Sequence, residues 1–125
     1  MTGIVVFAHG SRVEAANEAV RTMAAELALL GGFGAVEAAF LELGLPNLEG
    51  AADRLVERGI DSIVVIPYFL TEGLHMERDL PPILQRISQK YNGLRIAATE
   101  TLDGHPGLVQ AMLDRALSGI RSHIA

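Results

Sequence analysis

Cysteine and tryptophan are absent from this chain of 125 residues, and aromatic residues make up only 5% of it. Without cysteine the chain can form no disulfide, thiolate metal site or cysteine nucleophile, and a reducing cytoplasm is the expected location. Apolar residues nevertheless reach 50% of the chain and charged residues 20%, as in a globular protein. This length supports one hydrophobic core, so we expect a single domain over residues 1–125.

Long apolar runs and an excess of basic residues are also missing. No apolar run approaches the roughly 20 residues that a membrane-spanning helix needs. Residues 4–8 are apolar, but no basic segment precedes them, so we expect no signal peptide. The formal charge of −5 argues against a nucleic-acid partner. An anionic small molecule is still compatible with it, because arginines and helix N-termini act locally.

Several well-known catalytic and nucleotide-binding patterns are absent. The chain has no GxGxxG or GxxxxGK[ST] segment, which removes the main support for dinucleotide or nucleoside triphosphate binding. It also lacks the GxSxG elbow of hydrolases and the HExxH pattern of zinc proteases. The chemistry therefore has to come from other residues.

Four short apolar segments alternate with four helical patterns along the chain. We expect strands at residues 3–8, 35–41, 62–66 and 94–98. This alternation predicts an α/β fold, a doubly wound parallel sheet with helices on both faces. Right-handed crossovers favour the strand order 2-1-3-4. Glu37 is polar enough to indicate that the second strand lies at an edge.

The helix limits follow from capping residues and prolines. Ser11 and Glu14 fit a capping box at the start of the first helix. Pro46 suits the first turn of the second helix, and Pro81 and Pro82 suit the first turn of the third, near Asp79. Apolar stripes predict the core-facing residues Ala16, Val20, Met23, Leu27 and Leu30 in the first helix and Leu108, Met112, Leu113, Ala116, Leu117 and Ile120 in the last.

Two histidines follow the two strands expected at the centre of the sheet. His9 comes directly after residues 3–8, and His75 lies in an apolar loop after residues 62–66. In the order 2-1-3-4 these strands are neighbours where the winding reverses, and ligands bind beyond the carboxyl ends of strands at such a point. We therefore expect the two side chains to converge there. The alternatives are a turn role for His9 and a core or lid role for His75.

Two imidazoles form an incomplete metal site, which suits a divalent ion that has to pass through. Glu42, at the end of the second strand, is the preferred third ligand or proton acceptor, and Glu72 is the weaker candidate. His105, in Asp103-Gly104-His105-Pro106, is expected to cap the last helix.

These motifs resemble the small sirohydrochlorin chelatases, which are class II, ATP-independent chelatases. The resemblance rests on His9-Gly10-Ser11-Arg12, Phe40-Leu41-Glu42 with Pro46, Val65-Ile66-Pro67-Tyr68-Phe69-Leu70 with Gly73-Leu74-His75, and Gly104-His105-Pro106 with Arg115. It covers nearly the whole chain in order.

The resemblance implies insertion of Co²⁺ or Fe²⁺ into sirohydrochlorin without ATP, in cobalamin or siroheme biosynthesis. It implies His9 and His75 as the metal-binding and catalytic residues, no tightly bound cofactor, and a homodimer of single-unit chains in the cytoplasm. Ser11, Arg12, Phe69, Leu70, Gly73 and Leu74 are the expected macrocycle contacts, with Arg78 a further candidate for the peripheral carboxylates.

Other interpretations remain open from the sequence. The chain could be a metal or tetrapyrrole carrier of the same fold without turnover, or it could insert nickel into the same type of macrocycle. An anion-binding module that uses the His9–Ser11 turn is a third possibility. The sequence does not identify the physiological metal, since histidine accepts several.

Overall fold

The computed structural model describes residues 1–70 and 74–124, and the side chains of residues 1–70 and 77–122. Its centre is a parallel sheet of four strands, β1 (Thr2–Ala8), β2 (Val36–Phe40), β3 (Ser62–Pro67) and β4 (Arg95–Ala98). The strand order is β2-β1-β3-β4, as the sequence predicts. Val5 pairs with Glu37 on one side and with Val65 on the other, so β1 and β3 form the middle of the sheet.

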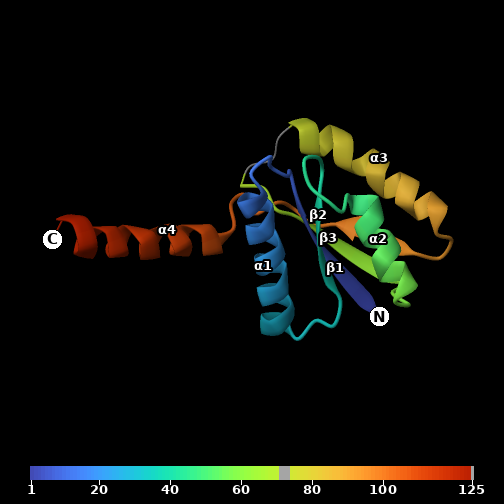
Figure 1. Ribbon diagram of the computed structural model, residues 1–125, viewed down its shortest axis with the longest axis horizontal. Coiled ribbons are helices and arrows are strands. Elements are labelled where there is room, and N and C mark those ends of the chain that lie inside the picture. The colour runs from blue at the N-terminus through green and yellow to red at the C-terminus, as the bar shows by residue number, and fades with distance from the viewer. Residues whose placement is uncertain (71–73, 125) are drawn as a thin grey trace.

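The two faces of the sheet are covered by different helices (Figure 1). Helix α1 (Glu14–Gly31) packs on one face, where Val6 and Ala8 meet Val20 and Ala24. Helices α2 (Leu48–Glu57) and α3 (Leu74–Lys90) pack on the other. There the larger core includes Val5, Phe7, Ala39, Leu48, Leu55, Ile63, Val65, Leu80 and Ile87. Successive strand residues alternate between the two cores because side chains in a strand point to opposite faces.

The buried stripe of α1 differs from the predicted one. Asn17, Val20 and Ala24 are buried, whereas Ala16, Met23 and Leu30 are exposed and Leu27 is half-buried. A stripe of Asn17, Val20 and Ala24 has the same helical spacing as the predicted one. Hydrophobic periodicity does not detect it, because its first member is polar. The helix ends at Gly32, which has a positive φ of 66°.

The predicted proline positions were wrong for both helices on the other face. Pro46 lies before α2, after a cis peptide bond, and Asn47 caps the helix by accepting a hydrogen bond from the Gly50 N–H. Pro81 and Pro82 lie inside α3, which begins at Leu74 instead of near Asp79. The helix therefore includes His75, which the sequence analysis had placed in a loop.

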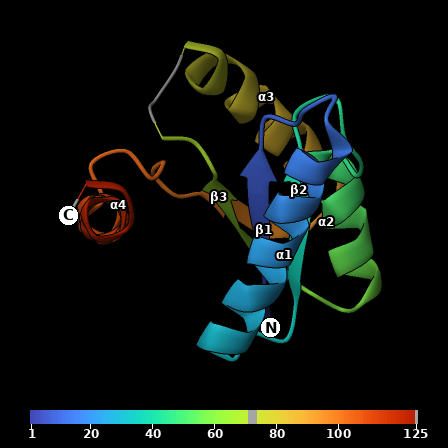
Figure 2. The same cartoon turned by 60° about the vertical axis from the view of Figure 1, so that its left-hand side comes forward.

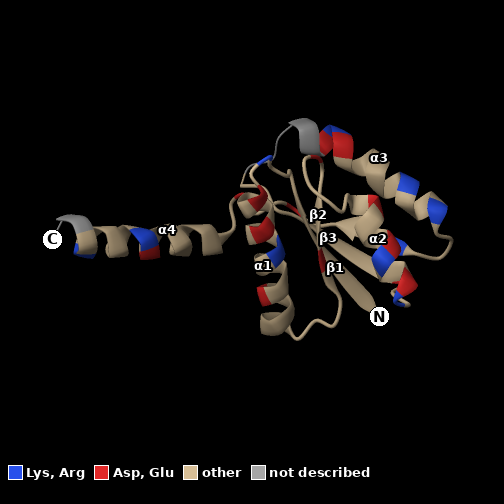
Figure 3. Cartoon of the chain, in the orientation of Figure 1, with Lys and Arg blue, Asp and Glu red and all other residues tan. Residues whose placement is uncertain are grey.

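Helix α4 (Pro106–Gly119) and the short helix η1 (Ile120–Ile124) extend away from the sheet (Figures 1 and 2). No residue of α4 is buried, so the prediction that its apolar stripe faces the core was wrong. Its exposed apolar residues include Val109, Met112, Leu113 and Leu117, and Ile120 at the start of η1 is also exposed. Figure 3 shows few charges on this helix, and Asp114 and Arg115 are the charged residues within Pro106–Gly119.

Candidate metal and tetrapyrrole site

His9 follows β1 directly, at the carboxyl end of the sheet. Its side chain is 51% exposed, and its Nε2 lies 3.5 Å from Oε1 of Glu42, which is 59% exposed. Its other ring nitrogen, Nδ1, is 3.4 Å from the carbonyl oxygen of Gly10. The structure thus brings together two predicted site residues that are 33 positions apart in the sequence.

The loops that carry His9 and Glu42 continue the pairing of their strands. The Leu41 N–H donates to the Ala8 carbonyl at 2.9 Å, and the Glu42 N–H donates to the His9 carbonyl at 3.0 Å. Gly10 then turns the chain with a φ of +97°, and a Cβ there would lie 1.7 Å from the Glu42 carbonyl oxygen. Glycine is required at this position by both the backbone conformation and the close approach.

Ser11 does not form the predicted capping box. Val13 is the N-cap of α1 and makes no side-chain cap bond, while Ser11 Oγ accepts a hydrogen bond from the Val13 N–H at 3.0 Å. Glu14 binds Arg21 at 2.6 Å instead of reaching back to Ser11. The hydrogen bond from Arg21 lowers the pKa of the Glu14 carboxyl. The helix starts two residues later than a capping box at Ser11 requires.

Asn17 is a residue of this region that the sequence analysis missed. It is 1% exposed and binds backbone groups of both loops. The only sequence signal was an asparagine inside an apolar stripe, where a buried amide needs partners to be tolerated.

The loop after β3 lies beside the end of β1, because the Tyr68 N–H donates to the Phe7 carbonyl at 2.7 Å. Phe69 is half-buried against the core of the α2–α3 face, and Leu70 is 63% exposed. Gly73 and Glu72 lie outside the described residues. Leu74 and His75 belong to the first turn of α3, but their side chains lie outside the described part of the structure.

The backbone thus places His9 after β1 and His75 at the start of the helix after β3, its neighbour in the sheet. Whether the two rings converge stays a prediction. Among the side chains that the structure describes, no three histidine, aspartate or glutamate residues form a group able to hold a metal ion.

Arg12 is exposed, and within residues 1–70 and 77–122 no ion pair holds its guanidinium. Arg78 is also exposed and binds Asp79 at 3.1 Å. His105 caps α4, as predicted, by accepting a hydrogen bond from the Gly107 N–H on its Nδ1 at 2.9 Å.

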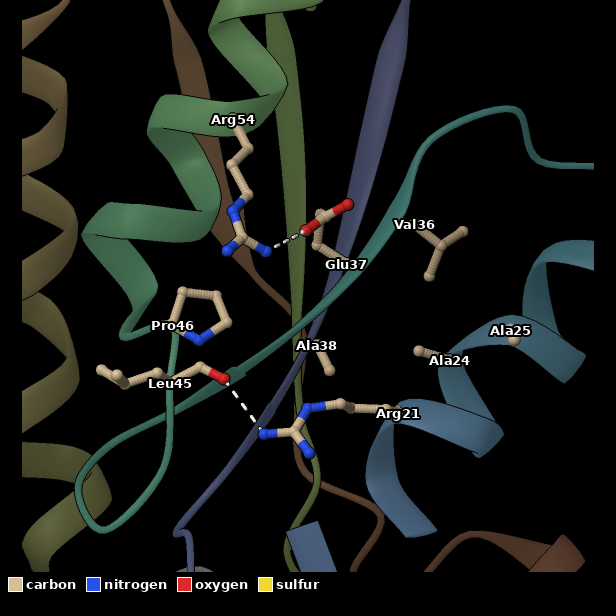
Figure 4. A pocket seen from close by; sticks show the side chains of 9 residues that line it. All are labelled: Arg21, Ala24, Ala25, Val36, Glu37, Ala38, Leu45, Pro46 and Arg54. Atoms are coloured by element: carbon tan, nitrogen blue, oxygen red, sulfur yellow. Dashed lines mark hydrogen bonds and ion pairs between the residues drawn. The ribbon is translucent and has the colours of Figure 1, made fainter. Parts of the chain in front are cut away.

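A pocket of about 370 Å³ at the free edge of β2 is a poorer candidate for the site (Figure 4). Arg21 and Arg54 lie on opposite sides of it. Each is already paired, Arg54 with Glu37 at 3.3 Å and Arg21 with Glu14, Glu18 and the Leu45 carbonyl. Their charges are therefore satisfied within the chain, and Glu37 marks the sheet edge as predicted.

Comparison with known proteins identifies the family. The sequence profile of the CbiX family matches residues 3–118. The chain belongs to the CbiX family. The resemblance drawn from the motifs is confirmed.

Two CbiX relatives are similar over much of the chain. A sirohydrochlorin cobaltochelatase from Sulfolobus acidocaldarius is 40% identical over 90 residues, which cover 72% of this chain and 72% of the relative. One from Methanopyrus kandleri is 38% identical over 84 residues, covering 67% of this chain and 59% of the relative. The chain therefore matches less than two thirds of the latter's length.

Among solved structures, the sirohydrochlorin chelatase SirB from Bacillus subtilis subspecies spizizenii in complex with cobalt superposes on this CbiX chain with a TM-score of 0.86. The sequence identity is 26%, and the match covers 94% of this chain and 50% of SirB. The fold of the CbiX chain thus corresponds to about half of that longer protein. No described helix of the chain is long and apolar enough to cross a membrane.

Proposed function

We propose that this protein is a cytoplasmic sirohydrochlorin chelatase that inserts a divalent metal, Co²⁺ or Fe²⁺, into sirohydrochlorin without ATP. Membership of the CbiX family supports the activity. The observation within the chain that carries it is the pair formed by His9 and Glu42 at the carboxyl end of β1 and β2.

The spacing of this pair suits an ion held between the two side chains. Two donors that bind one ion at about 2.1 Å each lie about 3.0–3.4 Å apart, depending on the coordination geometry. The 3.5 Å between Nε2 of His9 and Oε1 of Glu42 is close to this range. Both side chains are more than half exposed, so an arriving ion can exchange its waters for these ligands without unfolding the loop.

Insertion replaces two pyrrole N–H bonds by two bonds from the metal to the same nitrogens and releases two protons. An imidazole that has just given up its metal has a free nitrogen lone pair that can accept a proton at the reacting centre. We assign this role to His9 and, by the resemblance, to His75. Glu42 would hold the ion and orient it during transfer.

The remaining predicted contacts concern the macrocycle. Exposed Leu70 offers an apolar surface beside the end of β3, and exposed Arg12 offers a guanidinium for a peripheral carboxylate. Ser11, Gly73 and Leu74 stay in the proposed set. Phe69 is the weaker member, because its ring already packs against the core.

A spectrophotometric assay tests the activity. Protein, sirohydrochlorin and Co²⁺ or Fe²⁺ are mixed without ATP, and the metallated spectrum should appear faster than in a protein-free control. A carrier of the same fold would shift the pigment spectrum in proportion to the protein added and leave the insertion rate unchanged. That second outcome would replace the chelatase proposal with the carrier.

We propose further that the protein is a homodimer. Helix α4 exposes an apolar stripe, and an isolated helix of 14 residues is marginal in water. On the α1 face of the sheet, β3 and β4 are incompletely covered: Val64 and Ile66 are half-buried, and Ala97 is exposed. A second copy whose α4 covers this face would bury both surfaces at once.

Sedimentation velocity tests the dimer. Leu113→Glu places a charge in the apolar stripe of α4 and should convert the dimer to a monomer. Ser118→Glu adds the same charge about 140° further round the helix, and should leave the dimer intact. A wild-type protein that stays monomeric, or a Leu113→Glu variant that stays dimeric, would contradict the proposal.

A further inference from the structure

Asn17 is a buried polar side chain beside the candidate site. It is 1% exposed. Among the residues that the structure describes, it is the one polar or charged residue that is buried. It belongs to the first turn of α1, whose neighbouring buried residues, Val20 and Ala24, are apolar. Burying an amide costs free energy unless its hydrogen bonds are made, so its partners explain its position.

Three of its four hydrogen bonds go to backbone groups of the two loops that carry the site, and a longer one goes from Nδ2 to Oε2 of Glu14 at 3.4 Å. Asn17 Oδ1 accepts the Ser11 N–H at 2.9 Å, and Nδ2 donates to the Ser11 carbonyl at 2.8 Å and to the Leu43 carbonyl at 2.9 Å. The reverse orientation of the amide would set its NH₂ against an N–H and its oxygen against two carbonyls. One side chain therefore joins the loop after β1 to the loop after β2.

The second loop has an unfavourable backbone conformation at the residue that accepts the hydrogen bond from Asn17. Leu43 has a φ of +58°, which is costly for a residue with a branched side chain. Gly44, the next residue, passes so close that a Cβ there would lie 3.1 Å from Asn17 Nδ2 and 2.9 Å from the Phe40 ring. The hydrogen bond from Asn17 to the Leu43 carbonyl helps to hold this turn.

We infer that Asn17 is a positioning residue that sets the spacing of His9 and Glu42 for the metal ion. His9 is two residues before Ser11, and Glu42 is next to Leu43. Asn17 therefore holds both ligand-bearing loops through backbone groups adjacent to the proposed ligands. The inference rests on the proposed function, because it assigns His9 and Glu42 to the metal. Asn17 itself does not touch the ion.

This arrangement predicts an effect on the metal and not on the macrocycle. Loss of the amide would let the two loops move apart, and the ion would lose one of two simultaneous contacts. Residues that orient metal ligands typically change metal affinity by about 10–100-fold when they are replaced. Leu70 and Arg12, the proposed macrocycle contacts, make none of the Asn17 hydrogen bonds.

The test compares Asn17→Ser and Asn17→Asp with Val20→Ala. The serine variant removes both amide donors, and the aspartate variant keeps the acceptor for Ser11 but places an oxygen against two carbonyls. Val20, nearly one turn further along α1, is buried in the same cluster as Phe40 but contacts neither loop through a hydrogen bond, so its truncation controls for lost packing. Thermal unfolding shows how far each variant is destabilised.

Co²⁺ binding to the protein alone is measured by titration, followed by KM for Co²⁺ and for sirohydrochlorin. We expect both Asn17 variants to raise Kd and KM for Co²⁺ at least about tenfold, with KM for sirohydrochlorin changed less than twofold. Val20→Ala should leave all three constants near wild type. The binding titration needs no turnover, so a wild-type protein without chelatase activity would refute the proposed function and still leave this inference decidable.

Three results would overturn the inference. One is wild-type Co²⁺ affinity in an Asn17 variant that folds. Another is an equal loss of affinity in Val20→Ala at the same loss of stability. The third is failure of both Asn17 variants to fold, which would make Asn17 a requirement of the whole domain and not a positioning residue of the site.

Discussion

The β2–β1 side of the sheet and the β3–β4 side differ in how much of their structure one chain supplies. On the first side, α1 covers the strands, and the loops that carry His9 and Glu42 are joined by backbone hydrogen bonds and by Asn17. On the second side, β4 is largely exposed, and no residue of α4 is buried. A single chain therefore fixes the proposed metal ligands and leaves the apolar stripe of α4 exposed.

The difference agrees with the proposed metal site on the first side and the proposed homodimer contact on the second. A metal site needs donors at fixed separations, which local hydrogen bonds within one chain can provide. A flat macrocycle needs a broad surface, which a second copy can extend. Three predictions test this comparison, and a fourth tests a hydrogen-bonded cluster between α2 and α3; they follow in order of decreasing effect.

His9→Ala should have the largest effect, a loss of insertion activity of about 10²–10⁴-fold, the range typical of a lost general base. The side chain is 51% exposed, so the free energy of unfolding should change by less than about 0.5 kcal/mol. Metal insertion and thermal unfolding are measured on the same preparation. His105→Ala, which removes the cap of α4, is the control and should retain most of the activity. Full activity in His9→Ala would remove the assigned role.

Gly10→Ala tests how rigidly the β1 loop is built. A Cβ would stand 1.7 Å from the Glu42 carbonyl oxygen at a φ of +97°, so we expect a loss of about 3 kcal/mol in the free energy of unfolding. Gly93→Ala is the control. Gly93 has a similar φ of +88°, but no atom lies within 4 Å of a Cβ added there. That control should cost about 1–2 kcal/mol from backbone strain alone. Equal losses measured by denaturant unfolding would show that the contact with Glu42 is unimportant.

Ala97→Glu probes the uncovered face of the β3–β4 side. Ala97 is exposed in the single chain, so its replacement should change the free energy of unfolding of the monomer by less than about 0.5 kcal/mol. If α4 of a second copy covers this face, the dimer should dissociate at least about tenfold more readily, the equivalent of about 1.4 kcal/mol. Ala19→Glu, on an exposed position of α1, serves as the control in sedimentation equilibrium. Equal dimer affinities in the two variants would place the interface elsewhere.

Tyr91→Phe should have the smallest effect, on a hydrogen-bonded cluster between α2 and α3. The Tyr91 hydroxyl donates to the Asp53 carboxylate, and Lys90 binds Asp53 at 3.0 Å. The hydrogen bond from Tyr91, reinforced by Lys90, lowers the pKa of Asp53, and the same bond to Asp53 raises the pKa of Tyr91. We expect Tyr91→Phe to lower the free energy of unfolding slightly near pH 7, by less than Gly10→Ala does.

The sign of both shifts defines a pH window for this contribution. A lowered carboxyl pKa gives stability that is present above the unfolded value of about 4 and lost as the pH falls through the folded value. A raised tyrosine pKa gives stability that is present below about pH 10 and lost at higher pH. Urea unfolding of wild type and Tyr91→Phe at several pH values should therefore differ most between these limits. A difference that persists unchanged at pH 2 would contradict the assignment.

Much of the fold followed from the amino-acid pattern. The strand segments and the order β2-β1-β3-β4 were predicted, because apolar runs alternate with helical stripes and right-handed crossovers permit few orders. His9 and Glu42 were expected at one edge of the sheet, and the structure places them 3.5 Å apart. The capping role of His105 was also predicted correctly.

Other features could not be read from local pattern. Proline is compatible with several positions near a helix start, so Pro46 was placed inside a helix that it precedes, and the start of α3 was set too late. The stripe of α4 was recognised as apolar but assigned to the wrong partner. Periodicity shows that a face is apolar and does not show which surface covers it.

The sequence by itself determined the parallel sheet and the end of it at which His9 and Glu42 lie, since strand periodicity and chain connectivity are local properties. Only the tertiary structure decided that Asn17 joins the two loops, that Leu43 turns with a positive φ, and that α4 leaves the sheet. Each of these depends on contacts between segments distant in the chain, or on their absence among the described residues. The free energy of such contacts comes from shape and hydrogen-bond geometry in three dimensions, which no short stretch of sequence encodes.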